Sequence, residues 1–243
     1  MRLRNMLNKT VFALLAALSL AASASAADFD NFKYASARTM KPFARDLGGL
    51  LGSGTNQTAR PLGFSGFDIG IRAVTQFNPS SGNTVLRRDN LFGLGFVQAE
   101  IGMPYRIDGF VRAGVVEGLT VAGGGLRYGL WNVSDEKGKF NAMLIGMGNM
   151  AASRYFYAVH FNASAVCSLN VPVVSPFIGA GYDFTRLNAQ GVADTALDGK
   201  QVRTAEPRVS AGFRVKMHLG YLSVSVTQTH GRSLLGASAG FRF

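Results

Sequence analysis

From Phe67 onward, apolar side chains recur at every second position along runs of ten to fifteen residues. In one such run the apolar and polar sets interleave, Val209, Ala211, Phe213 and Val215 against Arg208, Ser210, Gly212 and Arg214. A period of two is that of a β-strand with one apolar and one polar face. Strands of soluble sheets are usually about five or six residues long, whereas strands of ten or more can cross a bilayer at a tilt. The pattern therefore predicts membrane-spanning strands.

The composition agrees with an all-β fold that is poor in charge. Charged residues make up 16% of the 243 positions, below the roughly 25% of a soluble domain, and glycine occurs 30 times. The abundance of apolar and aromatic residues excludes disorder, and the lone Cys167 excludes a disulfide scaffold. No stretch after the first 27 residues is apolar over about 18 positions, which excludes a bundle of membrane helices.

The first 26 residues have the three parts of a secretory signal peptide. Basic residues at positions 2, 4 and 9 begin it, the apolar run 11–20 follows, and Ala24-Ser25-Ala26 supplies small residues for cleavage. The apolar run is too short to span a bilayer, so we expect cleavage after Ala26 rather than an uncleaved anchor. Loss of these three basic residues from the 25 leaves 22 Lys and Arg against 14 Asp and Glu.

Residues 27–62 follow a helical period instead of the strand period. Over 30–51, one stripe carries apolar residues at three- and four-residue steps, which are Phe32, Met40, Phe43, Leu47, Leu50 and Leu51. Pro42 lies inside this segment and predicts two short helices or one kinked helix. Glycines at 48, 49, 52 and 54 are expected to end it, and a polar linker leads to Pro61. We expect the segment on the periplasmic side, either as a plug in the lumen or flat on the membrane surface.

Residues 63–243 are predicted to form one closed, antiparallel transmembrane β-barrel of about ten strands. The strands are expected at 66–77, 92–103, 106–116, 119–133, 140–150, 154–169, 174–187, 205–219, 221–230 and 233–243. If both ends of the barrel chain are periplasmic, the two longest connections, 78–91 and 188–204, both fall on the outer side. Closure is required because a sheet edge in hydrocarbon leaves backbone groups unpaired. A soluble secreted β-sandwich is the alternative fold.

Aromatic residues near the predicted strand ends indicate interfacial girdles. These residues are Tyr105, Tyr128, Trp131, Tyr155, Tyr182 and Tyr221.

The last strand ends with alternating apolar residues, Leu235, Ala237, Ala239, Phe241 and Phe243. A terminal Phe preceded by this alternation resembles the C-terminal signature of bacterial outer-membrane β-barrels, which their assembly machinery reads. The blocks 41–48 and 62–70 are similar to a group of uncharacterised bacterial barrel proteins with an N-terminal helical segment. The resemblance implies a location in the bacterial outer membrane and Phe241 and Phe243 as the assembly signal. It also implies outer-membrane lipids and the assembly machinery as partners, and no assigned activity.

The polar faces of the strands predict a basic lumen. The residues expected to line it are Arg72, Glu100, Arg112, Arg127, Asn162, Asp183, Arg208, Arg214 and Lys216. Because basic residues outnumber acidic ones, an open lumen would favour anions. Ten strands enclose little space, so we expect a sealed or plugged interior with paired Arg and carboxylate groups before an open pore. The expected function is a structural role or a small-solute pore or transport role.

A lipid-modifying barrel enzyme, an acyl hydrolase or transferase, is the alternative function. Its candidate residues are His160 as base and Ser164 as nucleophile, which share one strand face with Asn162. A Ser two residues from the His, the spacing of the outer-membrane phospholipase and lipid A deacylase families, is absent because Asn162 stands there. The three scattered His and single Cys have no metal-ligand spacing, so we expect neither metal nor other cofactor.

Charges on the two long predicted loops indicate a further lipid partner. At the outer rim, lipopolysaccharide phosphates would meet Arg87, Arg88, Lys200 and Arg203, with ordinary solvated loop charges as the alternative. The remaining basic residues are spread through alternating strands instead of being gathered on one face, which argues against nucleic acid. The sequence leaves the oligomeric state open.

Overall fold

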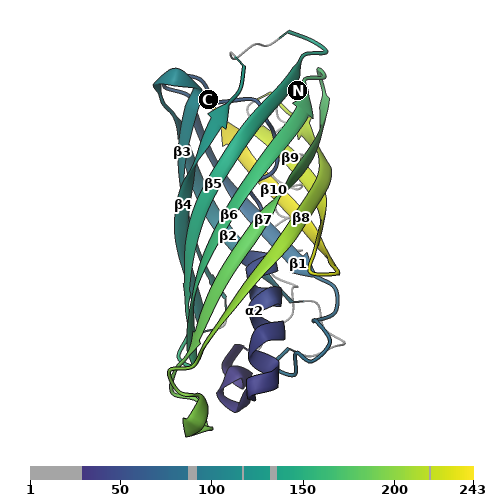
Figure 1. The fold of residues 1–243 in the computed structure, drawn as a ribbon. Coiled ribbons are helices and arrows are strands. Elements are labelled where there is room, and N and C mark those ends of the chain that lie inside the picture. Colours follow the sequence, from purple (N-terminus) through teal and green to yellow (C-terminus); the bar gives the residue numbers. More distant parts are fainter. Residues whose placement is uncertain (1–28, 87–91, 117, 132–135, 219) are drawn as a thin grey trace, which may run out of the picture.

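Ten antiparallel strands close into a barrel around an N-terminal helical segment (Figure 1). The computed structural model describes residues 29–86, 92–116, 118–131, 136–218 and 220–243. The predicted signal peptide, residues 1–26, lies outside these ranges, as do Arg87 and Arg88. Among the described residues, no helix combines the length and the apolar character needed to cross a bilayer.

The strands follow the predicted ranges closely. They are β1 (Phe67–Gln76), β2 (Phe92–Gly102), β3 (Ile107–Val116), β4 (Leu119–Gly129), β5 (Phe140–Ala152), β6 (Phe156–Leu169), β7 (Val174–Ala189), β8 (Gln201–Lys216), β9 (Gly220–Thr229) and β10 (Arg232–Arg242). Neighbours in sequence are neighbours in the barrel, and β1 pairs with β10, so the sheet closes on itself. The predicted closed antiparallel barrel is confirmed.

Two strand boundaries differ from the prediction by four residues, the largest differences in the barrel. β8 begins at Gln201 because it continues to pair with β7 as far as Asn188, so Arg203 belongs to a strand and not to a loop. Figure 1 shows this β7–β8 hairpin projecting beyond the other strands, with the short helix η3 (Thr195–Leu197) at its tip. β4 ends at Gly129, four residues before the predicted position.

The barrel is apolar outside and largely polar inside. Large apolar side chains are exposed along the strands, among them Val97, Ile101, Val111, Leu126, Phe161, Ile178 and Val226. The residues that alternate with them are buried, and many carry charge. A soluble sandwich would bury the apolar face between its sheets. The single closed ring and its apolar exterior therefore exclude the sandwich alternative.

The N-terminal segment lies inside the barrel and not on a membrane surface. It consists of the helices η1 (Phe29–Tyr34) and α2 (Ala37–Leu51), and α2 contacts β1, β2, β6, β7 and β8. Residues 52–62 then run through the lumen to the start of β1, and 55–59 are all buried. We refer to residues 29–62 as the plug.

The plug enters from the end of the barrel that carries the long connections. There the Ala193 N–H donates to the Lys33 carbonyl at 2.8 Å, and the hydroxyls of Thr39 and Thr84 lie 3.0 Å apart. The barrel chain begins and ends at the opposite rim, where Phe67 and Phe243 exchange two backbone hydrogen bonds. The expectation that the helix lies at the same rim as the barrel termini is therefore wrong.

The reason for this placement is an apolar zone inside the barrel. At the long-connection end the inward residues are apolar, for example Phe92 and Leu94 on β2 and Phe156 on β6. The Phe43 ring of α2 lies 5.1 Å from the Phe156 ring and 4.8 Å from that of Phe32 in η1. Burial of these rings stabilises the plug at the end where matching apolar surface exists.

Within the plug, the position of the helix break and the roles of two glycines differ from the prediction, whereas Gly52 caps α2 as expected. The helical segment divides at Ala35 and Ser36, and α2 continues through Pro42. Gly48 and Gly49 also lie inside α2. A Cβ on Gly48 would stand 2.2 Å from the Thr185 hydroxyl oxygen, and one on Gly49 would stand 2.7 Å from the His230 ring. These glycines permit close approach of the helix to the barrel wall.

Candidate functional site

The candidate functional site is the filled lumen, and the structure places every predicted lumen residue on its wall. Eight of these side chains are buried, namely Arg72, Glu100, Arg112, Arg127, Asn162, Asp183, Arg208 and Arg214. Lys216 is partly buried and donates to the Val171 carbonyl at 3.1 Å, near the rim of the barrel termini. The wall groups bond mainly to one another and to the plug backbone.

A single carboxylate fixes the helix to the long-connection end. Asp46 of α2 is fully buried and accepts hydrogen bonds from Asn83 Nδ2 at 2.6 Å, Gln76 Nε2 at 2.7 Å and Ser80 at 2.7 and 2.8 Å. His230, in the turn between β9 and β10, contributes Nε2 at 3.1 Å. These partners come from the barrel and its connections, so Asp46 joins the plug to three separate parts of the chain. We call this cluster the latch.

Protonation of Asp46 should weaken the latch at acidic pH. Burial raises the pKa of this carboxyl, but the hydrogen bonds from His230, Asn83, Ser80 and Gln76 together hold it below its ordinary value of 3.8. Because the pKa is lower in the bound state, the carboxylate stabilises that state above 3.8, and the contribution is lost as pH falls below it. Hydrogen exchange of the α2 amides should therefore stay slow down to that pH and accelerate beneath it.

Asp46→Asn provides the control for this titration. The amide cannot ionise, so the acid-induced acceleration should become smaller in this variant while neutral-pH exchange is already faster. Equal pH profiles for the two proteins would show that other carboxyl groups control the release.

Two arginines from facing parts of the wall hold the carboxyl end of α2. Arg208 of β8 donates to the Gly49 carbonyl at 2.7 Å and the Ser53 hydroxyl at 2.9 Å, and it pairs with Asp183 of β7 at 2.7 Å. Arg112 of β3 donates to the Ser53 carbonyl at 2.7 Å and also to the Leu51 carbonyl. The last carbonyls of a helix lack partners within it and carry partial negative charge. The two guanidinium groups supply hydrogen-bond donors to these carbonyls and positive charge beside their partial negative charge.

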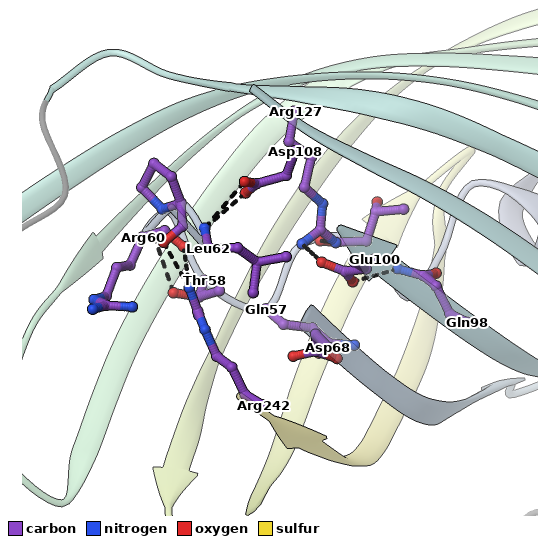
Figure 2. A network of polar contacts seen from close by, with 12 residues as sticks. Gln57, Thr58, Arg60, Leu62, Asp68, Gln98, Glu100, Asp108, Arg127 and Arg242 are labelled. Carbon is purple, nitrogen blue, oxygen red and sulfur yellow. Dashed lines mark hydrogen bonds and ion pairs between the residues drawn. The ribbon is translucent and has the colours of Figure 1, made fainter. Parts of the chain in front are cut away.

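Beyond the helix, an ion-pair network occupies the lumen (Figure 2). Glu100 of β2 pairs with Arg127 of β4 at 2.7 Å and with Arg72 of β1 at 3.1 Å, and it accepts a bond from Gln98 at 2.7 Å. Arg72 also pairs with Asp68 at 3.3 Å. Because all these groups are buried, each charge depends on its partner for stabilisation. This arrangement joins β1, β2 and β4 across the inner face of β3.

The same network holds the extended part of the plug. Arg127 donates to the Thr55 carbonyl at 2.8 Å, and Arg242 of β10 donates to the Pro61 carbonyl at 2.6 Å. The Leu62 N–H donates to both oxygens of Asp108, at 3.0 and 3.1 Å (Figure 2). The barrel wall thus supplies backbone partners along the whole path from α2 to β1.

The candidate catalytic residues lie under the plug and bond to different partners. His160 is fully buried, its Nδ1 lies 3.0 Å from the Thr185 hydroxyl, and its Nε2 lies 3.5 Å from Asp183. Ser164 donates to Asn162, and Asn162 donates to Asp183 at 2.8 Å. Among the described residues, no hydrogen bond joins His160 to Ser164. Thr185 in turn lies against Gly48 of α2.

Several lumen residues escaped the sequence-based prediction. Tyr221, expected in an interfacial girdle, is buried and bonds to Arg72 at 2.5 Å and to Asp68 at 2.8 Å. Its position is in phase with the inward Ser223, whereas Leu222 alternates with it, so the strand period contained this information. His230, in the turn between β9 and β10, faces Asp46. No local signal joins these two residues, which are 184 positions apart.

The remaining described residues of the predicted assembly signal and of the predicted lipopolysaccharide contact are exposed on the outside of the barrel. Phe241 and Phe243 are exposed at the rim of the barrel termini, and Lys200 is exposed near the tip of the β7–β8 hairpin. Arg203 is exposed on β8. In the described part of the chain, no group of three His, Cys, Asp or Glu residues is arranged to hold a metal ion.

Comparison with known proteins gives matches among solved structures alone. No protein-family model and no curated protein matches the chain. The N-terminal β-barrel domain of Pseudomonas aeruginosa OprF matches at 12% identity and a TM-score of 0.41, over 74% of this chain and 99% of that one. The KdgM porin matches at 7% identity and a TM-score of 0.37, over 72% of this chain and 99% of the porin chain. The Acinetobacter baumannii outer membrane protein Omp33 matches at 8% identity and a TM-score of 0.33, over 76% of this chain and 100% of the Omp33 chain. Likenesses of this size transfer no activity to this chain.

Proposed function

We propose that this chain is an outer-membrane β-barrel that acts as a small-solute pore kept closed by its own N-terminal plug. The observation that carries the proposal is the set of bonds from the barrel wall to the plug backbone, made by Arg112, Arg208, Arg127 and Arg242. Such bonds are reversible, because water can replace each partner when the plug leaves. A barrel meant only as a scaffold could fill its lumen with side chains of the wall alone.

The apolar exterior supports the membrane location. A closed ring of strands leaves no unpaired edge, and its outward side chains suit hydrocarbon. With the barrel termini on the periplasmic side, the helices of the plug occupy the outer half of the lumen and the projecting β7–β8 hairpin faces outward. Export through the signal peptide, assembly through Phe241 and Phe243, and contact of Lys200 and Arg203 with lipopolysaccharide belong to the same proposal.

The lipid-modifying alternative receives less support from the geometry. His160 faces the lumen and is covered by α2, whereas a lipid substrate would approach from the outer apolar surface. The bonds of Ser164 to Asn162 and of Asn162 to Asp183 suit a structural network. We therefore assign His160 to the wall that supports the plug.

Conductance of the refolded protein in planar bilayers tests the proposal. The wild-type barrel should remain closed, and Asp46→Ala should produce openings because the latch loses its acceptor. The matched control is Asp30→Ala, which removes an exposed carboxylate of the same plug and should stay closed. Migration of unheated and heated samples in a gel verifies that each variant forms a barrel.

A reversible lock sharpens this test. The hydroxyls of Thr39 in α2 and Thr84 in the connection after β1 lie 3.0 Å apart, so cysteines at both positions should form a disulfide across the latch. In a Cys167→Ala background, Thr39→Cys and Thr84→Cys added to Asp46→Ala should suppress the openings, and a reductant should restore them. Steady conductance of the wild type would overturn the plugged-pore assignment. Openings of the Asp46→Ala variant that persist after the disulfide has formed would also overturn it.

A further inference from the structure

A cavity of about 360 Å³ lies at the rim where the barrel chain begins and ends, below the plug linker. Its wall includes Arg60 and Leu62 of the linker and residues of β5 to β10, with Tyr221, Arg242 and Phe243 among them. None of the latch residues takes part in it. The cavity is therefore separate from the latch, and Arg242 is the wall residue that it shares with the contacts that hold the plug linker.

The charged groups around this cavity are all cationic. Arg60, Arg214, Lys216 and Arg242 line it, and no aspartate or glutamate of the described residues does so. Arg214 stacks on the Tyr221 ring, with its guanidinium carbon 3.5 Å from the ring centroid, and lies 3.5 Å from Asp68. The hydrogen bonds of Arg242 go to backbone carbonyls, and within the described chain no carboxylate pairs with it. Asp68 is shared between Arg214 and Arg72, so it does not neutralise both Arg214 and Arg242 at this end.

Two buried polar side chains on the same wall have no partner. Asn141 Nδ2 of β5 and Ser175 Oγ of β7 both line the cavity, and neither has a hydrogen-bond partner. The two residues are 2% and 4% exposed. Buried polar groups in native proteins are nearly always hydrogen-bonded, so donors in such a position indicate an acceptor supplied from outside the chain.

We propose that this cavity binds the oxyanion group of a small solute, a phosphate or a carboxylate. Guanidinium groups present planar pairs of N–H donors that match the two oxygens of such a group. The Asn141 amide and the Ser175 hydroxyl supply further donors, and Ser175 is the direct cross-strand neighbour of Arg214. The volume admits an inorganic phosphate or a small organic acid. The site opens to the lumen side of the wall, which favours a dissolved anion over a lipid headgroup.

Calorimetric titration of the refolded barrel with inorganic phosphate, at constant ionic strength set by sodium chloride, tests this site. Phosphate should bind the wild type, and Arg242→Gln should weaken the affinity by about tenfold or more, the effect of one charged hydrogen bond. Ser175→Ala should weaken it to a smaller extent with little risk to folding. Arg154→Gln removes an exposed arginine in the connection between β5 and β6, outside this cavity, and should leave the affinity unchanged.

The membrane composition separates the two sources of the anion. Phosphate affinity should be the same in bilayers of phosphatidylcholine alone and in bilayers that also contain phosphatidylglycerol. A lower apparent affinity in the second case would assign the site to a lipid headgroup and overturn the dissolved-anion proposal. Absence of binding, or equal affinity in wild type, Arg242→Gln and Ser175→Ala, would overturn the site itself. Either failure would leave the conductance test of the plug unaffected, because the latch lies at the other end.

Discussion

A chain that lacks residues 27–62 should conduct ions steadily where the full chain stays closed. The plug fills the lumen from the aromatic cluster around Phe43 and Phe156 to the linker, whose Thr55 carbonyl accepts a hydrogen bond from Arg127. Without it, the carbonyl acceptors of Arg112, Arg127 and Arg208 disappear. These side chains would then be hydrated by water that enters the barrel, and a continuous water path would replace the packed helix.

The opened barrel should prefer anions. Among the described residues, the buried basic residues of the wall are Arg72, Arg112, Arg127, Arg208 and Arg214, joined by the partly buried Arg242, and the buried acidic residues are Asp68, Glu100, Asp108 and Asp183. The excess of positive charge lowers the energy of an anion in the lumen and raises that of a cation. The reversal potential in a salt gradient should therefore have the sign of anion selectivity.

Two controls make this result decisive. Heat-dependent gel migration establishes that the shortened chain still closes as a barrel. A separate peptide of residues 27–62, added to the side of the long connections, should reduce the conductance again. The same peptide with Asp46→Ala should do so less effectively, because it lacks the latch acceptor. A shortened barrel that forms but remains closed would contradict the role of residues 29–62 as the plug.

Much of this barrel could be read from the two-residue period, because that period states which side chains share a face. Strands such as β6 and β8 have uninterrupted alternation, and their inward residues Asn162 and Arg208 were predicted accordingly. Closure follows from the membrane environment, since every strand edge needs a partner there. The face on which each side chain lies and the order of the strands along the chain together determine which residues line the barrel wall.

The two-residue period does not indicate what fills the barrel. The end at which the plug enters is indicated only by a weaker signal, a change from apolar to polar residues along the inward face of a strand. On β2, Phe92, Leu94 and Phe96 lie in phase with Gln98 and Glu100, so one inward face is apolar at one end and polar at the other. An apolar stretch that faces inward requires a covering segment, because water cannot stabilise it. That change of character along one face marks the end of the barrel that the helix enters. The contact of Asp46 with His230 had no comparable signal.

Substitution of Arg208 by Met should destabilise the protein by about 3–5 kcal/mol, the cost of leaving one member of a buried ion pair alone. Arg208 is the guanidinium that pairs with Asp183 at 2.7 Å, and both residues are buried. The substitution also removes the bonds to the Gly49 carbonyl and the Ser53 hydroxyl. The carboxyl end of α2 would then depend on Arg112 and on the weaker bond from Asn149 to the Leu51 carbonyl, so barrel stability and plug retention should decrease together.

Urea unfolding of the protein refolded into lipid vesicles measures this loss, and a second substitution isolates its cause. Asp183→Asn keeps the shape of the side chain and its bond from Asn162 while it removes the charge that Arg208 neutralises. If the uncompensated carboxylate is responsible, Arg208→Met with Asp183→Asn should recover most of the stability lost by Arg208→Met alone. The openings caused by the weakened helix end should persist in the double variant, since the bonds to Gly49 and Ser53 are still missing. Equal stability of the single and double variants would mean that Arg208 acts through the plug contacts and not through the ion pair.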